Sequence, residues 1–272
     1  AERASRSRAD RCSLRAMDLG LRGKKALVTG GSRGIGRATA LVLAAEGAHV
    51  AVAARGEAEL AEVVATIEAA GGRAQAIACD VSRREGANEV VARAAEALGG
   101  LDVLVNNVGG SVGSGAFDEA DDEAWARVLD LNLMSAVWCS RAALAPLEAS
   151  GGGCIVFVSS ICGLEYCTSA PYTAAKGALA SLAKEMGVDL APKKIRVVAV
   201  APGSIMFPGG SWDKRRTTHP ELIERMLKHE LPWGRFGAAE EVANAIAFVA
   251  SARASWITGT SIVVDGGQSR GV

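Results

Sequence analysis

The sequence predicts one α/β domain, in which a doubly wound parallel sheet of seven strands is flanked by helices. Short apolar runs alternate with Ala/Glu/Leu-rich stretches of helical spacing from residue 24 onward. The strand segments are almost wholly apolar, which is typical of a parallel sheet covered on both faces. Gly47, Gly71 and Gly99 follow helix-like stretches, where a glycine often ends a helix.

The elements can be assigned in chain order. Strands are expected at 25–29, 49–54, 74–79, 101–106, 154–159, 195–200 and 261–265. Helices are expected at 34–47, 57–72, 84–100, about 122–147, from about 170, and 238–251. No repeat, linker or second domain is evident.

An irregular stretch at about 204–236 interrupts the strand–helix rhythm. It is expected to hold a short helix beginning near Pro220, because proline is favoured in the first helical turn. Long insertions in compact domains often act as lids, and a plain surface excursion is the alternative. The domain is therefore placed at 17–272. The Arg- and Ser-rich residues 1–16 are expected to be a leader, a tag or a disordered extension.

Composition excludes several function classes. Thirty basic and thirty acidic residues give zero formal net charge, which disfavours nucleic acid or a membrane surface as a partner. No apolar run approaches the roughly 20 residues that span a bilayer. The six cysteines lack metal-site spacing, so no metal is expected. They are interpreted as reduced thiols of a cytoplasmic protein, with a disulfide possible but unsupported.

The stretch ALVTGGSRGIGRAT joins the first strand to the first helix. Its glycines permit a tight turn and close approach of a ligand, and the helix N-terminus attracts a pyrophosphate. This arrangement predicts a Rossmann-type dinucleotide site. The candidate cofactor-binding residues here are Gly30, Ser32, Arg33, Gly34, Ile35 and Gly36.

The end of the second strand indicates which dinucleotide binds. NAD sites usually carry an acidic residue there, whereas this chain has Ala54 followed by Arg55. With Arg33, Arg55 suits a 2′-phosphate, so NADP(H) is preferred and NAD(H) is possible. Asp80 is expected to accept a hydrogen bond from the adenine amine, or else to cap a helix.

Tyr172 and Lys176 lie one helical turn apart, on one face of the expected helix. A phenol titrates near pH ~10 and a neighbouring cation lowers that value, which would make the phenol a usable acid. Alone, this spacing is equally compatible with an ordinary helix surface.

Together, the motifs resemble those of the short-chain dehydrogenase/reductase family. TGGSRGIG, ACDV, NNVG, DLNLMS, FVSSICG, YTAAK, VAPGSI and VVDGG occur in the family's order, over Leu21 to Gly267. The resemblance implies that Tyr172 is the catalytic acid/base and that Ser160 binds the substrate oxygen. It also implies that Lys176 binds the nicotinamide ribose and lowers the Tyr172 pKa. Asn132 would hold a water linking Lys176 to solvent.

The resemblance adds Val81, Asn107, Pro202, Gly203 and Ile205 to the cofactor-binding candidates, beside Tyr172 and Lys176. Ser159 is the alternative to Ser160 and is expected to be structural. The family's usual Thr after Pro-Gly is missing, and Met206 and Phe207 stand nearby. Candidate substrate-pocket residues are Gly110, Ser111, Cys162, Leu164, Tyr166, Phe207 and Trp212.

The expected activity is NADP(H)-dependent reduction of a ketone, with 3-oxoacyl thioesters as a frequent substrate class of the family. A secondary-alcohol or sugar dehydrogenase is the alternative. A non-catalytic NADP(H)-binding sensor or scaffold is the alternative from another class. The resemblance also implies a homotetramer.

Overall fold

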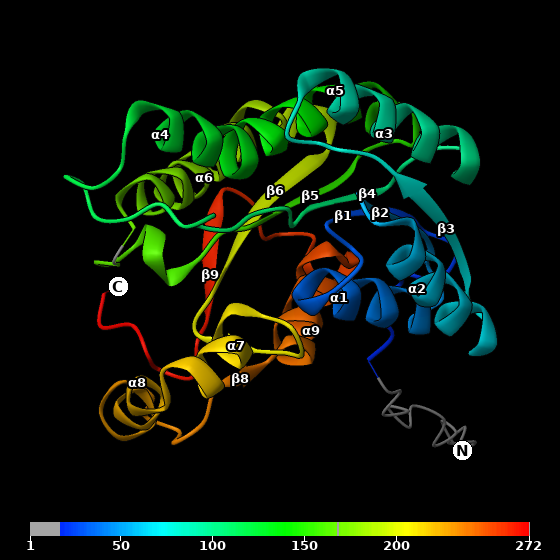
Figure 1. Cartoon of the computed structure of the whole chain (residues 1–272). Coiled ribbons are helices and arrows are strands. Elements are labelled where there is room, and N and C mark those ends of the chain that lie inside the picture. The colour runs from blue at the N-terminus through cyan, green and yellow to red at the C-terminus, as the bar shows by residue number, and fades with distance from the viewer. Residues whose placement is uncertain (1–16, 168, 272) are drawn as a thin grey trace, which may run out of the picture.

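The computed structural model describes residues 17–167 and 169–271, so the expected N-terminal extension lies outside the described residues. Seven parallel strands form one sheet, in the order β3-β2-β1-β4-β5-β6-β9 (Figure 1). The predicted single-domain, Rossmann-type seven-stranded fold is thus confirmed. The strands are β1 (Lys25–Thr29), β2 (His49–Ala54), β3 (Arg73–Ala78), β4 (Val103–Asn106), β5 (Gly153–Val158), β6 (Ile195–Pro202) and β9 (Thr260–Val264).

Helices cover both faces of this sheet, because both faces of its central strands are apolar and buried. One face carries α1 (Gly34–Ala45), α2 (Glu57–Ala69) and α9 (Ala239–Ala250) (Figure 1). The other carries α3 (Arg84–Leu98), α5 (Ser135–Ala149) and α6 (Ala170–Asp189). Each layer has its own apolar core. Among the described residues, no helix is long and apolar enough to cross a membrane.

Left-handed glycines end three of these helices, as the sequence predicts. Gly47, Gly71 and Gly99 have φ values of 85°, 80° and 71°. Residues with a Cβ rarely adopt this conformation, so glycine releases the chain from the helix at little cost.

The expected long helix at 122–147 is interrupted rather than continuous. α4 (Asp122–Leu129) passes into a π-helical turn, η1 (Asp130–Met134), before α5 begins at Ser135. Such turns widen a helix by one residue and are frequent at functional sites. Asn132 lies in this turn and is fully buried.

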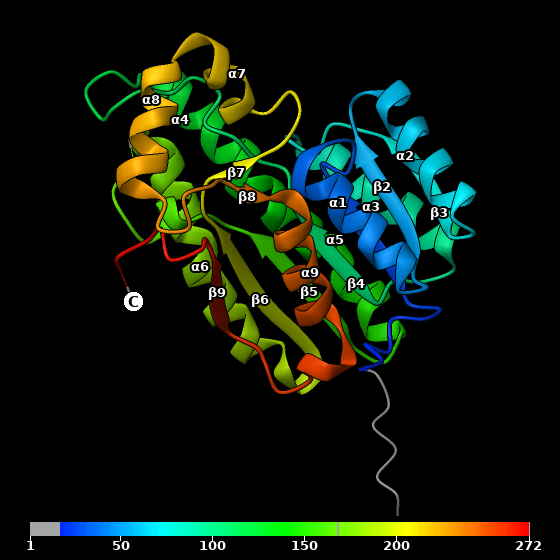
Figure 2. The same cartoon turned by 90° about the horizontal axis from the view of Figure 1, so that it is seen from below.

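The insertion after β6 is closed at its base by a two-stranded sheet that the sequence did not predict. β7 (Ile205–Met206) pairs in parallel with β8 (Gly237–Ala238). Between them lie α7 (Ser211–Thr218), α8 (Pro220–Arg225) and a π-helical turn, η4 (Met226–Glu230). The helix expected to begin at Pro220 is present, with Ile223 and Met226 buried. α7 and α8 lie beyond the C-terminal ends of the central strands (Figure 2).

Candidate active site

Lys176 occupies the centre of the candidate site. Its side chain is buried near the N-terminal end of α6, and its Nζ donates a 2.8 Å hydrogen bond to the Val158 carbonyl at the end of β5. Burial lowers the pKa of this amine from 10.5 to about 8, because the charged form loses hydration. The ammonium also lies 5.5 Å from the centre of the Tyr172 ring.

Tyr172 and Ser160 meet beside this amine. Tyr172 comes from the first turn of α6, and Ser160 follows β5 directly. Burial raises the pKa of the Tyr172 phenol, and the nearby Ser160 hydroxyl lowers it by less. In the protein without a cofactor, the Tyr172 pKa is therefore raised, contrary to the expectation that Lys176 lowers it. The Lys176 ammonium lies over the face of the Tyr172 ring and donates its hydrogen bond to the Val158 carbonyl.

Ser159 and Ser160 have different partners. The Ser159 hydroxyl is buried and donates a 2.8 Å hydrogen bond to the Lys176 carbonyl, tying β5 to α6. The Ser160 Oγ accepts a 3.1 Å hydrogen bond from the Cys162 amide. This geometry favours a structural role for Ser159 and leaves the Ser160 hydroxyl hydrogen free to donate.

Asn132 anchors the loop that follows β4. Its Nδ2 donates to the Val128 and Gly110 carbonyls, and its Oδ1 accepts from the Gly110 amide, each at 2.9 Å. A Cβ on the neighbouring Gly109 would lie 2.6 Å from Asn132 Oδ1 and 2.9 Å from Lys176 Nζ. Asn132, Gly109 and Lys176 are therefore packed together, and a larger residue at 109 would separate them.

The glycine turn after β1 fits a dinucleotide pyrophosphate. Gly30 and Gly34 have φ values of 65° and 54°. A Cβ on Gly36 would lie 2.2 Å from the Gly30 carbonyl oxygen, so the turn closes only with glycine there. Arg33 precedes α1 without capping it by a side-chain hydrogen bond, which leaves the helix N-terminus to an anionic ligand. The Asn107 amide donates to the Thr29 and Gly30 carbonyls and so holds this turn against β4.

Arg33 and Arg55 are exposed near the ends of the first two strands. Partial burial acts to raise the pKa of the Asp80 carboxyl, but hydrogen bonds from Ser82 and the charges of Arg55 and Arg83 lower it below its ordinary value. Asp80 Oδ1 accepts hydrogen bonds from both the amide and the hydroxyl of Ser82, so Asp80 stabilises the turn before α3. It does not cap that helix, whose N-cap residue is Arg83. Val81 beside it is buried.

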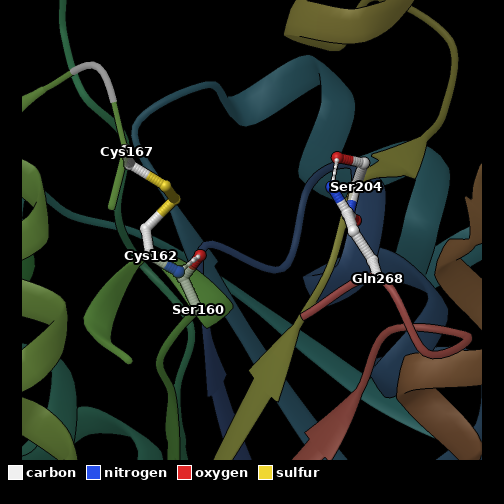
Figure 3. Close-up of a disulfide and its surroundings, with 5 residues drawn as sticks. All are labelled: Ser160, Cys162, Cys167, Ser204 and Gln268. Carbon is white, nitrogen blue, oxygen red and sulfur yellow. Dashed lines mark hydrogen bonds between the residues drawn. A yellow bond between two sulfur atoms is a disulfide. The ribbon is translucent and has the colours of Figure 1, made fainter. Parts of the chain in front are cut away.

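The segment from Pro202 to Ile205 is fixed by the C-terminal tail. Gly203 donates to the Val264 carbonyl at 3.0 Å. The Gln268 amide oxygen accepts from the Ser204 amide at 2.7 Å, and its Nε2 donates to the Ser204 hydroxyl at 3.0 Å (Figure 3). Ser204 is thus engaged where the family usually has its Thr. Sequence reasoning missed Gln268, because one polar residue after the VVDGG motif carries no periodic signal.

Phe207 faces the glycine turn rather than the Ser160 side of the site. A Cβ on Gly34 would lie 2.7 Å from the Phe207 ring, so the ring rests directly on that glycine. Its place in the substrate pocket stays a prediction. The ring reaches the turn because β7 and β8 direct the chain across the end of α1.

The cysteine prediction also needs correction. Cys162 and Cys167 form a disulfide with Cα atoms 5.4 Å apart, whereas Cys79, Cys139 and Cys154 are free thiols. The remaining Cys12 lies outside the described residues. The spacing of five residues across a tight turn permits the bond, and that spacing was the only available signal. Disulfides are rare in reducing compartments, so the cytoplasmic location stays a prediction.

The described residues contain no cluster of His, Cys, Asp or Glu suited to a metal ion. They do bring a phenol, a hydroxyl and a buried amine together where the central strands end, next to a turn that fits a pyrophosphate. Ligands bind at this end of open α/β sheets. The arrangement defines a nucleotide-dependent oxidoreductase site of the acid/base type.

The comparisons with known proteins agree with this class. Residues 30–269 match a family model described as enoyl-(acyl carrier protein) reductase. The human protein "Dehydrogenase/reductase SDR family member 4" is 36% identical over 251 residues, covering 91% of this chain and 88% of that protein. An uncharacterized oxidoreductase of Methylorubrum extorquens is 39% identical over 253 residues, covering 91% and 98%. The chain belongs to the short-chain dehydrogenase/reductase family.

Two solved structures illustrate the likeness. L-sorbose reductase from Gluconobacter frateurii, complexed with NADPH and L-sorbose, has a TM-score of 0.89 and 33% identity, covering 94% of this chain and all of that one. A 7α-hydroxysteroid dehydrogenase complexed with NADH and 7-oxo glycochenodeoxycholic acid has a TM-score of 0.85 and 34% identity, covering 92% and 96%.

The raised Tyr172 pKa can be measured directly, because Tyr166 and Tyr172 are the only tyrosines. In a Tyr166→Phe variant without cofactor, the phenolate absorbance should rise with a midpoint above the ordinary value of ~10. A Tyr172→Phe variant supplies the reference curve for the other tyrosine. A midpoint below the ordinary value would mean that the Lys176 charge outweighs burial.

Proposed function

We propose that the protein is an NADP(H)-dependent carbonyl reductase that interconverts a ketone and a secondary alcohol. The observation that carries the proposal is the meeting of Tyr172, Ser160 and Lys176 at the C-terminal ends of β5 and β6. A phenol and a hydroxyl that lie this close together can both reach one substrate oxygen. That is the requirement for polarising a carbonyl and then protonating it.

Each residue has a separate task in this proposal. Ser160 donates a hydrogen bond to the carbonyl oxygen and stabilises the negative charge that develops there. Tyr172 gives its proton to that oxygen, and the raised pKa keeps the phenol protonated at neutral pH before the reaction. Lys176 and the π-helical turn at Asn132 keep the phenol in place. A nicotinamide cofactor supplies the hydride when bound, and the glycine turn with Lys176 would hold it.

The chemistry runs in reverse for alcohol oxidation, in which Tyr172 removes the hydroxyl proton. A secondary-alcohol or sugar dehydrogenase is therefore the second candidate, and the likeness to a reductase crystallised with L-sorbose supports it. A 3-oxoacyl thioester remains a proposed substrate, with no residue contact in the structure that favours it over a ketose or an oxosteroid. A substrate panel with all three ketone classes distinguishes these possibilities.

Replacing Tyr172 with Phe tests the acid/base role. We expect kcat for ketone reduction to fall by about 10²–10⁴-fold, while NADPH affinity measured by fluorescence changes little. Arg93→Ala, at an exposed residue of α3, is the control and should retain activity. Full activity in Tyr172→Phe would refute the mechanism. Tight NADPH binding by the native protein, without turnover of any ketone or alcohol, would favour the sensor alternative.

The preference for NADP(H) rests on Arg33 and Arg55, together with the absence of a carboxylate at Ala54. Hydrogen bonds to a charged group contribute about 1.5–3 kcal/mol each, so Arg55→Ala should weaken NADPH binding by roughly 10- to 100-fold. NADH binding should change little. Arg93→Ala, which removes an exposed ion pair with Glu89, is the control. Equal losses for both cofactors would contradict the assignment.

The exposed edge of the sheet supports a homotetramer. β9 is one of the two terminal strands, and an unpaired strand edge can pair with another chain. Among the exposed apolar side chains, Val263 belongs to β9, Val188 and Phe248 belong to helices that contact it, and Trp256 lies in the segment just before it. Trp256 is 98% exposed. We expect light scattering to give four times the chain mass, and Trp256→Ser to lower it. A native monomer would refute this proposal.

A further inference from the structure

The disulfide closes a small loop immediately after Ser160. Cys162 lies in the short 3₁₀ turn η2 (Ile161–Gly163), and Cys167 returns to it five residues later (Figure 3). The turn is tight, because the amides of Gly163 and Leu164 bond to the carbonyls of Ser160 and Ile161. The bond therefore links the residue two positions after Ser160 to the segment that leads into α6.

The half-cystine itself touches the candidate catalytic group. The Cys162 amide donates a 3.1 Å hydrogen bond to the Ser160 Oγ, which occupies one acceptor position of that hydroxyl. The Ser160 hydrogen is then directed elsewhere, toward Tyr172 or a substrate oxygen. The direction of the Ser160 hydroxyl thus depends on where the Cys162 backbone is held.

The rest of the loop is packed against the site and the tail. A Cβ on Gly163 would lie 2.5 Å from the Lys176 backbone, so the loop rests directly on α6 at that residue. The Glu165 carboxylate accepts from the Arg270 and Gly271 amides of the C-terminal tail. The same tail carries Gln268, which holds Ser204 on the other side (Figure 3).

We propose that the Cys162–Cys167 disulfide is a positioning bond for the Ser160 hydroxyl, and that a dithiol reductant slows carbonyl reduction by opening it. The proposal rests on the proposed function for its activity arm. In the redox step the dithiol sulfurs form a new disulfide and release two electrons and two protons. The S–S bond between Cys162 and Cys167 breaks, and each sulfur becomes a thiol. Oxidation by a small disulfide reverses the change.

The bond is placed where a reductant can reach it. Cys162 and Cys167 are half-buried, and their loop exposes Leu164 and Tyr166. Cys139 and Cys154 are instead buried, and burial raises their thiol pKa values to about 12 and about 11. A thiolate is the reactive form, so these two thiols should react slowly in the folded protein.

The first experiment establishes the bond and its effect. Native protein is alkylated with iodoacetamide before and after dithiothreitol, and the labelled cysteines are identified by mass spectrometry. Labelling of Cys162 and Cys167 only after reduction is expected, together with at least a fivefold fall in kcat and NADPH affinity unchanged within twofold. Reoxidation should restore kcat. In a Cys139→Ala control, dithiothreitol should lower kcat as much as it does in the native protein. A Cys162→Ser/Cys167→Ser variant should have a low kcat from the start, and dithiothreitol should not change it.

The second experiment needs no substrate and reports on Ser160 itself. The nearby Ser160 hydroxyl lowers the pKa of Tyr172, so a misplaced Ser160 should raise the phenolate midpoint further. The midpoint is compared in Tyr166→Phe alone and in Tyr166→Phe with Cys162→Ser and Cys167→Ser. Thermal unfolding and NADPH binding establish that both variants are folded.

These measurements separate the positioning role from the proposed activity. An upward shift of the midpoint in a folded variant supports the positioning role, even if no ketone is turned over. Alkylation of Cys162 and Cys167 before reduction would overturn the proposal, because it would show that the two thiols are free. The proposal would also be overturned if the native protein contains the disulfide but the Cys162→Ser/Cys167→Ser variant changes neither the Tyr172 midpoint nor kcat.

Discussion

The arrangement of the site depends on one buried amine. Lys176 Nζ donates a hydrogen bond to the Val158 carbonyl, and this bond joins the end of the central strand β5 to α6. Lowering its pKa from 10.5 to about 8 corresponds to about 3 kcal/mol of lost solvation for the charged form. Tyr172, Gly109 and Gly163 all pack against this residue. A buried cation of this kind is costly for folding and is typical of a functional site.

The parallel sheet explains why these groups meet. Ser160 follows β5, Asn106 ends β4, and Pro202 ends β6, and these neighbouring strands finish at one edge. The π-helical turn carries Asn132, whose side-chain amide bonds to Gly110 in the loop after β4. Its two hydrogen bonds with Gly110 hold the loop after β4 close to Lys176. The sheet therefore places Ser160, and the π-helical turn at Asn132 places the loop after β4 beside Lys176.

The outer parts of the site come from segments that lie far apart in the chain. The tail holds Ser204 through Gln268 and contacts Glu165, which belongs to the disulfide loop beside Ser160. β7 and β8 close the insertion and direct Phe207 onto Gly34. These contacts come from loops and the end of the chain, whereas Ser160 follows a strand of the rigid sheet, an arrangement that is common in α/β folds.

The sequence by itself determined the seven strands, their parallel pairing and the glycine turn. The spacing of apolar residues and the conformational freedom of glycine are local properties of the chain. The C-terminal tail contact at Ser204, the disulfide at Cys162 and the raised Tyr172 pKa were decided by tertiary structure alone. Each depends on the distance between segments, or on how much water surrounds a group, and no spacing along the chain encodes either quantity. Tyr172 shows the difference most plainly. Its place one turn before Lys176 was readable from the sequence, but burial and the neighbouring Ser160 hydroxyl set the pKa of its phenol.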